Sequence, residues 1–148
     1  MAKDKIFGEY DTLSIERIRN LSEAPIAPDG VPFLDRDFVI VARHVGKKNI
    51  HTALHAYKMF LDQTGSTRKL HLCGSGPLTA EYLKLTDDLG IKESVIFHGF
   101  LQTENVAKIL AKSLVLILPS LEEQFGLVVI EAQSVGLPVL VSVPCGAR

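Results

Sequence analysis

Residues 119–132 read PSLEEQFGLVVIEA, and this stretch decides how the chain folds. The run before it, from Ser113 to Leu118, is short and almost wholly apolar, which is typical of a strand buried on both faces. Pro119 ends that strand. A helix of nine or ten residues should follow the turn, because Gly136 and Pro138 form a typical helix stop. Residues 113–138 therefore predict one strand–turn–helix unit of an α/β protein.

The start of this helix is a candidate anion site. The backbone N–H groups of Phe125, Gly126 and Leu127 should lack helical partners there, and such groups favour a negative or strongly polar ligand atom. Glu123 precedes these donors, and Glu131 lies within the helix. A rise of about 1.5 Å per residue separates the two carboxylates by roughly 9–12 Å, about the reach from a ribose across a diphosphate to a sugar. Either glutamate could instead be an ordinary solvated side chain, but a charge on a largely apolar helix needs a partner or a ligand.

The composition describes one globular domain with a substantial core. Of 148 residues, 47% are hydrophobic, and 16 Lys and Arg oppose 17 Asp and Glu, so no basic surplus points to nucleic acid. No apolar run approaches the length of a membrane span, and the first residues do not read as a signal peptide. Cys73 and Cys145 make no disulfide framework, so we expect a reducing, cytoplasmic setting, with Cys73 as a small buried hydrophobe.

Apolar strands and helical stretches alternate along most of the chain. The strands are expected at Phe38–Ala42, Leu70–Cys73, Val95–Phe97, Leu114–Leu118 and Val139–Val143, and the helices near 49–63, 77–89, 103–112 and 126–135. Such alternation predicts a Rossmann-like parallel sheet of about five or six strands with helices on both faces. Residues 37–148 would form this domain. Residues 1–36, with a possible helix from Leu13 to Leu21 and a proline-rich connector, would be interdomain linker rather than core.

Ligands of such sheets bind outside the carboxyl ends of the strands, so the segment after each strand is a candidate site. Arg43 and Lys48 follow the first strand and could hold a phosphate, Arg as a fork and Lys as a point charge. Alone, each would be read as an ordinary surface cation. Glycine loops follow the second and third strands and would let a ligand approach the backbone closely: Gly74, Gly76, Gly99 and the adjoining Phe100.

Several other patterns carry little weight. The Gly74–Pro77 loop fails the dinucleotide fingerprint because Thr79 stands where its last glycine belongs. Asp35 and Asp37 mimic a metal-binding D-x-D motif but precede the first strand, at the opposite edge of the sheet. His51 and His55 have a zinc-like spacing without a third ligand, so we expect a surface pair and no metal site.

Taken together, Glu123 to Leu127, Glu131-Ala132 and Gly136 to Val139 resemble the E-x7-E signature of retaining GT-B glycosyltransferases, of the group 1 or family 4 type. Arg43 and Lys48 also resemble that family's Gly-Arg-x4-Lys element, although Ala42 replaces one glycine and Asn49 a frequent second one. The likeness covers residues 37–148. It implies the C-terminal, donor-binding half of a two-domain GT-B enzyme, truncated at its C-terminus.

The resemblance also implies roles. Arg43 and Lys48 would bind the donor diphosphate, Glu123 would contact hydroxyls of the transferred sugar, and Glu131 would hold the ribose. The reaction would move a hexose from a nucleotide diphosphate sugar to a hydroxyl with retention, without metal or cofactor. The remaining donor contacts would come from the glycine loops and the helix start: Gly74, Gly76, Gly99, Phe100, Phe125, Gly126 and Leu127.

The partners follow from the same likeness. They are the nucleotide sugar and the missing N-terminal acceptor domain, without which this chain should bind donor weakly and not turn over. Work in cell-surface polysaccharide or lipopolysaccharide synthesis would be compatible with peripheral membrane association of the full-length enzyme. A GT-B-related nucleotide-sugar epimerase or phosphorylase, and a non-catalytic nucleotide-binding module, stay open as alternatives.

Overall fold

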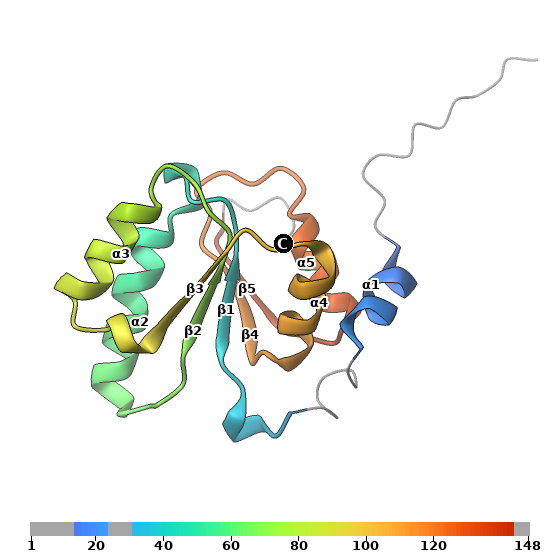
Figure 1. The fold of residues 1–148 in the computed structure, drawn as a ribbon, viewed down its shortest axis with the longest axis horizontal. Helices are drawn as coiled ribbons and strands as arrows, with labels where there is room; N and C mark the ends of the chain where they lie inside the picture. Colours follow the sequence, from blue (N-terminus) through green and yellow to red (C-terminus); the bar gives the residue numbers. More distant parts are fainter. Residues whose placement is uncertain (1–13, 24–30, 144–148) are drawn as a thin grey trace, which may run out of the picture.

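A computed structural model describes residues 14–23 and 31–143 of the chain, and it contains a five-stranded parallel sheet (Figure 1). The strand order is β3-β2-β1-β4-β5, and every neighbouring pair is parallel. The predicted Rossmann-like fold is therefore confirmed. The strands are β1 (Phe38–Val41), β2 (Leu70–Cys73), β3 (Val95–Gly99), β4 (Val115–Leu118) and β5 (Val139–Val141).

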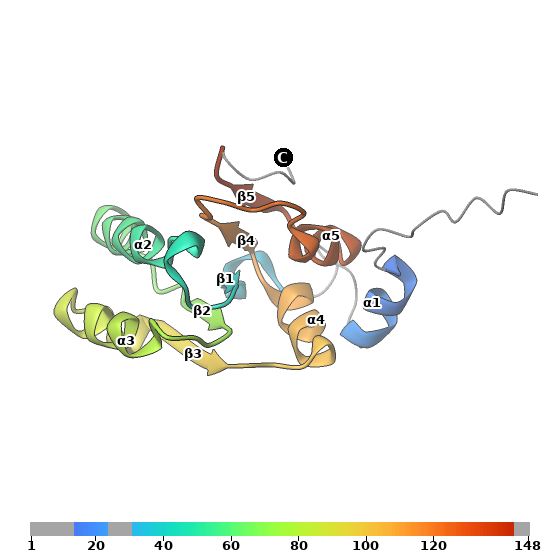
Figure 2. The same cartoon turned by 90° about the horizontal axis from the view of Figure 1, so that it is seen from above.

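Helices cover both faces of the sheet, as the alternating pattern predicts (Figures 1 and 2). One face carries α2 (Ile50–Thr64) and α3 (Thr79–Asp88), and the other carries α4 (Thr103–Lys112), α5 (Leu127–Ser134) and α1 (Ile15–Ser22). Short 3-10 turns occur at Phe33–Asp35, Gly46–Lys48 and Lys92–Ser94. The predicted bounds agree with the observed ones to within two residues at each end.

The core has two parts because the central strand is buried on both sides. Val39 of β1 packs among residues of α4 and α5, whereas Ile40 packs among residues of α2 and β2, and both are almost fully buried. Burying one such side chain is worth about 1.5–3 kcal/mol. The continuous apolar runs read from the sequence correspond to this two-sided burial.

The N-terminal helix corrects one expectation. We expected residues 1–36 to be linker rather than core, but α1 packs against α4 and α5, and its Ile18 is only 2% exposed. The Arg19 side chain also donates a 2.7 Å hydrogen bond to the Ser134 carbonyl at the end of α5. The linker interpretation does not hold for this helix, because its Ile18 belongs to the same buried cluster as residues of α4 and α5. Most of the proline-rich connector lies outside the described residues.

The topology creates a crevice at the carboxyl edge between β1 and β4. These strands are neighbours, but the chain leaves β1 toward α2 on one face and leaves β4 toward α5 on the other. This divergence is the switch point at which α/β sheets bind ligands. Within the described parts of the chain, no helix is long and apolar enough to cross a bilayer.

Candidate functional site

The two predicted cations lie at this switch point. Arg43 follows β1 and is exposed, and Lys48 ends the 3-10 turn that leads into α2. Both contribute to a cavity of about 390 Å³ between the β1 and β4 exits. Residues that the sequence assigned to the site line most of this cavity: Arg43, Lys48, Glu123, Phe125, Gly126 and Leu127.

An ion pair joins the two sides of this cavity. The Lys48 ammonium donates a hydrogen bond to the Glu123 carboxylate, and the two side chains are only 18% and 16% exposed. The sequence placed the two residues in one site but did not predict this contact. Since the pair is largely withdrawn from water, its attraction is screened less than that of a surface pair.

The start of α5 supplies unpaired donors to the same cavity. Gly126 precedes the helix with a φ of 59°, in the left-handed region that favours glycine, and no side chain caps the helix. No hydrogen bond between described residues uses the N–H of Phe125, Gly126 or Leu127. The structure thus agrees with the expected row of free amides, which carry partial positive charge.

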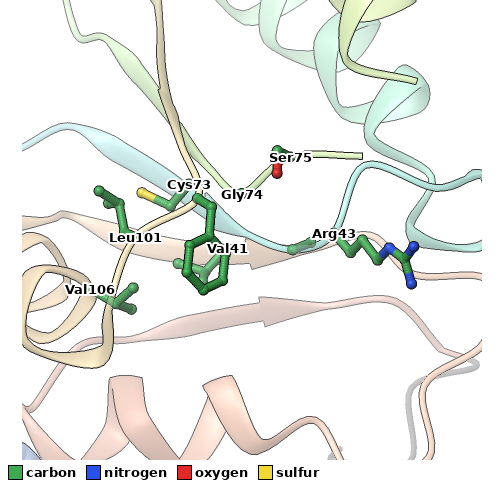
Figure 3. Close-up of a pocket in the computed structure, with 9 residues that line it drawn as sticks. Val41, Arg43, Cys73, Gly74, Ser75, Leu101 and Val106 are labelled. Atoms are coloured by element: carbon green, nitrogen blue, oxygen red, sulfur yellow. The ribbon is translucent and has the colours of Figure 1, made fainter. Parts of the chain in front are cut away.

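A second cavity, of about 420 Å³, adjoins the first because Arg43 lines both. Figure 3 shows Cys73, Leu101 and Val106 gathered at one end of it, while the Arg43 guanidinium extends from the other. Burial raises the pKa of the Cys73 thiol to about 12, so the thiol is protonated near neutral pH. This agrees with the expected small hydrophobe and disfavours a nucleophile. The cavity is apolar at one end and cationic at the other.

The predicted glycines differ in what they do. Gly74 and the 74% exposed Phe100 line the second cavity, whereas Gly76 and Gly99 line neither. A Cβ on Gly74 would lie 2.0 Å from the Ala42 carbonyl oxygen, and one on Gly76 would lie 2.5 Å from that of His44. For Gly74 and Gly76, the structure shows a further need for glycine, which is the close approach of the neighbouring backbone.

Glu131 is half-buried in α5 and lines neither cavity. Its carboxylate makes no hydrogen bond or ion pair with the described residues, and burial raises the pKa of the group. A partly desolvated carboxylate that has no partner among the described residues is the condition that the sequence predicted for a ligand-binding glutamate.

His44 is a part of the site region that sequence reasoning missed. It is 1% exposed, and its Nδ1 lies 2.9 Å from the Thr79 hydroxyl, which also bonds the Gly76 backbone. Its backbone N–H donates to the Ser75 carbonyl at 3.0 Å, which ties the β1 exit to the β2 exit. Burial lowers the pKa of His44, so the ring is neutral near pH 7. The sequence near a strand end does not indicate that a histidine there is buried and ties two strand exits together.

The metal-like motifs of the sequence line neither of these two cavities in the part of the chain that the structure describes. No cluster of three or more His, Cys, Asp or Glu residues there could hold a metal ion. His51 and His55 are exposed neighbours on α2. Asp37 accepts a 2.7 Å hydrogen bond from the Lys69 N–H before β1, away from the cavities. Its carboxylate therefore helps to hold the amino-terminal edge of the sheet.

A family model described as "Glycosyl transferases group 1" matches residues 30–148. The chain belongs to this family. An uncharacterised glycosyltransferase of Methanocaldococcus jannaschii is 31% identical over 113 residues, a match that covers 76% of this chain and 28% of the relative. The O-antigen chain mannosyltransferase RfbU of Salmonella typhimurium is 29% identical over 142 residues, covering 95% of this chain and 39% of the relative.

The solved structures show the same fold. Anabaena Alr3699/HepE, crystallised with UDP and glucose, superimposes with a TM-score of 0.70 at 22% identity, covering 93% of this chain and 38% of that one. The resemblance read from the sequence is thus confirmed at the level of the family and its GT-B fold. The chain spans well under half the length of each of these three proteins.

Proposed function

We propose that this chain is the donor-binding half of a retaining, E-x7-E type glycosyltransferase that uses a nucleotide diphosphate sugar. One observation supports this above the others. Two cations and three unpaired amides converge on a single cavity at the switch point of the sheet. Such an arrangement suits a diphosphate, because fixed cations and helix N-termini both stabilise phosphate charge.

The two cavities suggest how the donor would lie. The base and ribose would occupy the larger, largely apolar cavity beside Gly74 and Phe100, and the diphosphate would cross at Arg43, which lines both cavities. The sugar would then reach Glu123, and Glu131 would hold ribose hydroxyls. Binding would turn Lys48 from Glu123 toward phosphate oxygen and release the carboxylate for the sugar hydroxyls.

The chemistry of this proposal is electrostatic. Breaking the bond between the anomeric carbon and phosphate builds positive charge on the sugar ring and negative charge on the departing diphosphate. Arg43, Lys48 and the amides from Phe125 to Leu127 would stabilise that negative charge in a partly dry cleft. The two cations would perform the charge neutralisation for which other enzymes use a divalent ion.

The hexose donor, the retained stereochemistry and a cytoplasmic role in cell-surface polysaccharide or lipopolysaccharide synthesis belong to the same proposal. RfbU, an O-antigen chain mannosyltransferase, supports the polysaccharide role by similarity. Since this chain corresponds to 39% of RfbU, turnover would need the acceptor half of a complete enzyme.

Calorimetric titration tests the proposal. Uridine, guanosine and adenosine diphosphates, with their sugar conjugates, are titrated into the wild-type chain and into Arg43→Ala and Lys48→Ala. We expect preference for one base and a loss of roughly 10- to 100-fold in affinity in each variant, because a hydrogen bond to a charged group is worth about 1.5–3 kcal/mol. Lys84→Ala, which removes an exposed cation of α3, is the matched control.

Two results would count against the proposal. Binding of none of the nucleotides by a folded wild-type chain would favour a non-catalytic interaction module. Equal losses in Lys84→Ala and in the Arg43 and Lys48 variants would show that general charge, rather than this cavity, attracts the ligand.

A further inference from the structure

Three consecutive residues of the β1 exit contact the β4 exit. The Lys47 carbonyl accepts a 2.8 Å hydrogen bond from the Leu121 N–H, Lys48 pairs with Glu123, and the Asn49 side-chain amide donates to the Pro119 carbonyl at 3.1 Å. These contacts cross the switch point, where the segments that follow β1 and β4 leave for opposite faces of the sheet. The pairing of β1 with β4 joins Phe38 to Val115 and Val39 to Leu116, and beyond it these contacts link the two exits.

Asn49 has an unusual backbone for a residue with a side chain. Its φ is 52°, in the left-handed region, and Glu23 is the only other non-glycine residue with positive φ among those described. Asn49 stands at the N-cap of α2, but its side chain caps no helical N–H. Its side-chain amide N–H instead donates to the Pro119 carbonyl. The side-chain amide oxygen, Oδ1, accepts a 2.7 Å hydrogen bond from the Thr52 hydroxyl.

A strained conformation persists when the surroundings determine it. Glycine would satisfy this backbone at lower cost, but it lacks the side-chain amide whose N–H donor reaches the β4 exit. That donor lies one residue from Lys48, and its acceptor lies four residues before Glu123.

We infer that Asn49 is a positioning residue, whose bond to Pro119 holds the β1 and β4 exits at the separation at which Lys48 and Glu123 face the donor cavity. The ligand in this inference is the one that the proposed function assigns. The contacts that hold the two exits are observed independently of that function. Preset loops bind a ligand more tightly, because less conformational entropy is lost on binding.

Asn49→Gly separates positioning from folding. Glycine adopts a φ of 52° without strain, and this gain offsets the lost hydrogen bonds and the more flexible unfolded chain, so thermal stability should change little, whereas the bond to Pro119 is lost. We expect amide hydrogen exchange of Leu121 to become about fivefold faster, and the affinity for the preferred nucleoside diphosphate to fall about three- to tenfold. Thr52→Ala is the matched control, because it removes the bond to Asn49 and keeps the one to Pro119.

The outcomes are distinct. Faster Leu121 exchange with weaker binding at unchanged stability, in Asn49→Gly but not in Thr52→Ala, supports the inference. Unchanged exchange overturns it, and so does faster exchange with unchanged affinity. If the wild-type chain binds none of the three nucleoside diphosphates, the proposed function fails and the positioning role with it, while Leu121 exchange still decides whether Asn49 holds the two exits together.

Discussion

The two sides of the β1 exit are fastened in different ways. Toward β2, the contacts are backbone to backbone: Gly74 packs on Ala42, and the N–H of the buried His44 donates to the Ser75 carbonyl. Toward β4, side chains make most of the contacts, and the pair of Lys48 and Glu123 keeps some exposure to water. The first side has no freedom to move without loss of packing, whereas the second can exchange its partners for a ligand.

This contrast predicts which substitutions should change stability and which should change ligand binding. Substitutions on the β2 side should change the free energy of unfolding, and substitutions on the β4 side should change binding with little effect on stability.

Gly74→Ala should give the largest effect. The new Cβ would lie 2.0 Å from the Ala42 carbonyl oxygen at a φ of 137°, so the β2 exit must shift or the sheet edge must open. We expect destabilisation by more than about 3 kcal/mol in urea unfolding, if the variant folds at all. Gly65→Ala is the control: its φ is 63° and nothing lies within 4 Å, so only the strain of about 1–2 kcal/mol applies. Equal losses would contradict the steric account.

His44 should make stability fall in acid. Burial lowers its pKa below the ordinary 6.5, so the folded state holds the neutral ring. The stability from the neutral ring is present above pH 6.5 and is lost as pH falls through 6.5 toward the lower, folded pKa. His44→Leu should therefore give a shallower decline in urea-derived stability between pH 7 and pH 5.

His98 should contribute to the same decline in stability in acid, so its contribution has to be measured separately from that of His44. Desolvation, and secondly His71, also lower the pKa of His98, so His98→Asn should remove a separate part of the same slope. The exposed His55→Gln is the control and should leave the decline as it is. A decline that is equally steep in His44→Leu would contradict the role of the buried ring.

Glu123→Gln should change binding more than stability. It removes the carboxylate charge that pairs with Lys48, but the glutamine carbonyl can still accept a hydrogen bond from the ammonium, so we expect a loss of less than about 1 kcal/mol from folding. The freed ammonium should bind a nucleoside diphosphate several-fold more tightly in calorimetry, while the advantage of the sugar conjugate over the bare diphosphate shrinks. Weaker binding of the bare diphosphate would contradict a competition between Glu123 and phosphate for Lys48.

Glu131→Gln should have the smallest effect on folding, and its sign is informative. Because burial raises the pKa of Glu131, the folded state disfavours the charged form, and stability is lost as pH rises above the ordinary 4.5. The glutamine variant should be more stable at pH 7 by up to about 1 kcal/mol, since residual solvent screens the charge, and equal to wild type below pH 4.5. Reduced stability at pH 7 would mean that the carboxylate has a favourable interaction in the free protein.

The local patterns predicted the elements well and the contacts between them poorly. The apolar run before Pro119 and the stop at Gly136 located β4 and α5, because burial and helix termination are properties of neighbouring residues. The same reasoning read the α1 region as linker, because it could not know that α4 and α5 leave room for Ile18.

The sequence by itself determined the fold class and the family, because the alternation of strands and helices follows from periodicity and the family resemblance from the residues of its motifs. Only the tertiary structure decided which residues at the carboxyl edge touch. The pairing of Lys48 with Glu123, the reach of Asn49 to Pro119 and the packing of Gly74 on Ala42 join residues 32 to 75 positions apart. Such contacts depend on how the exits of separate strands converge, and that convergence is set by the packing of the whole sheet.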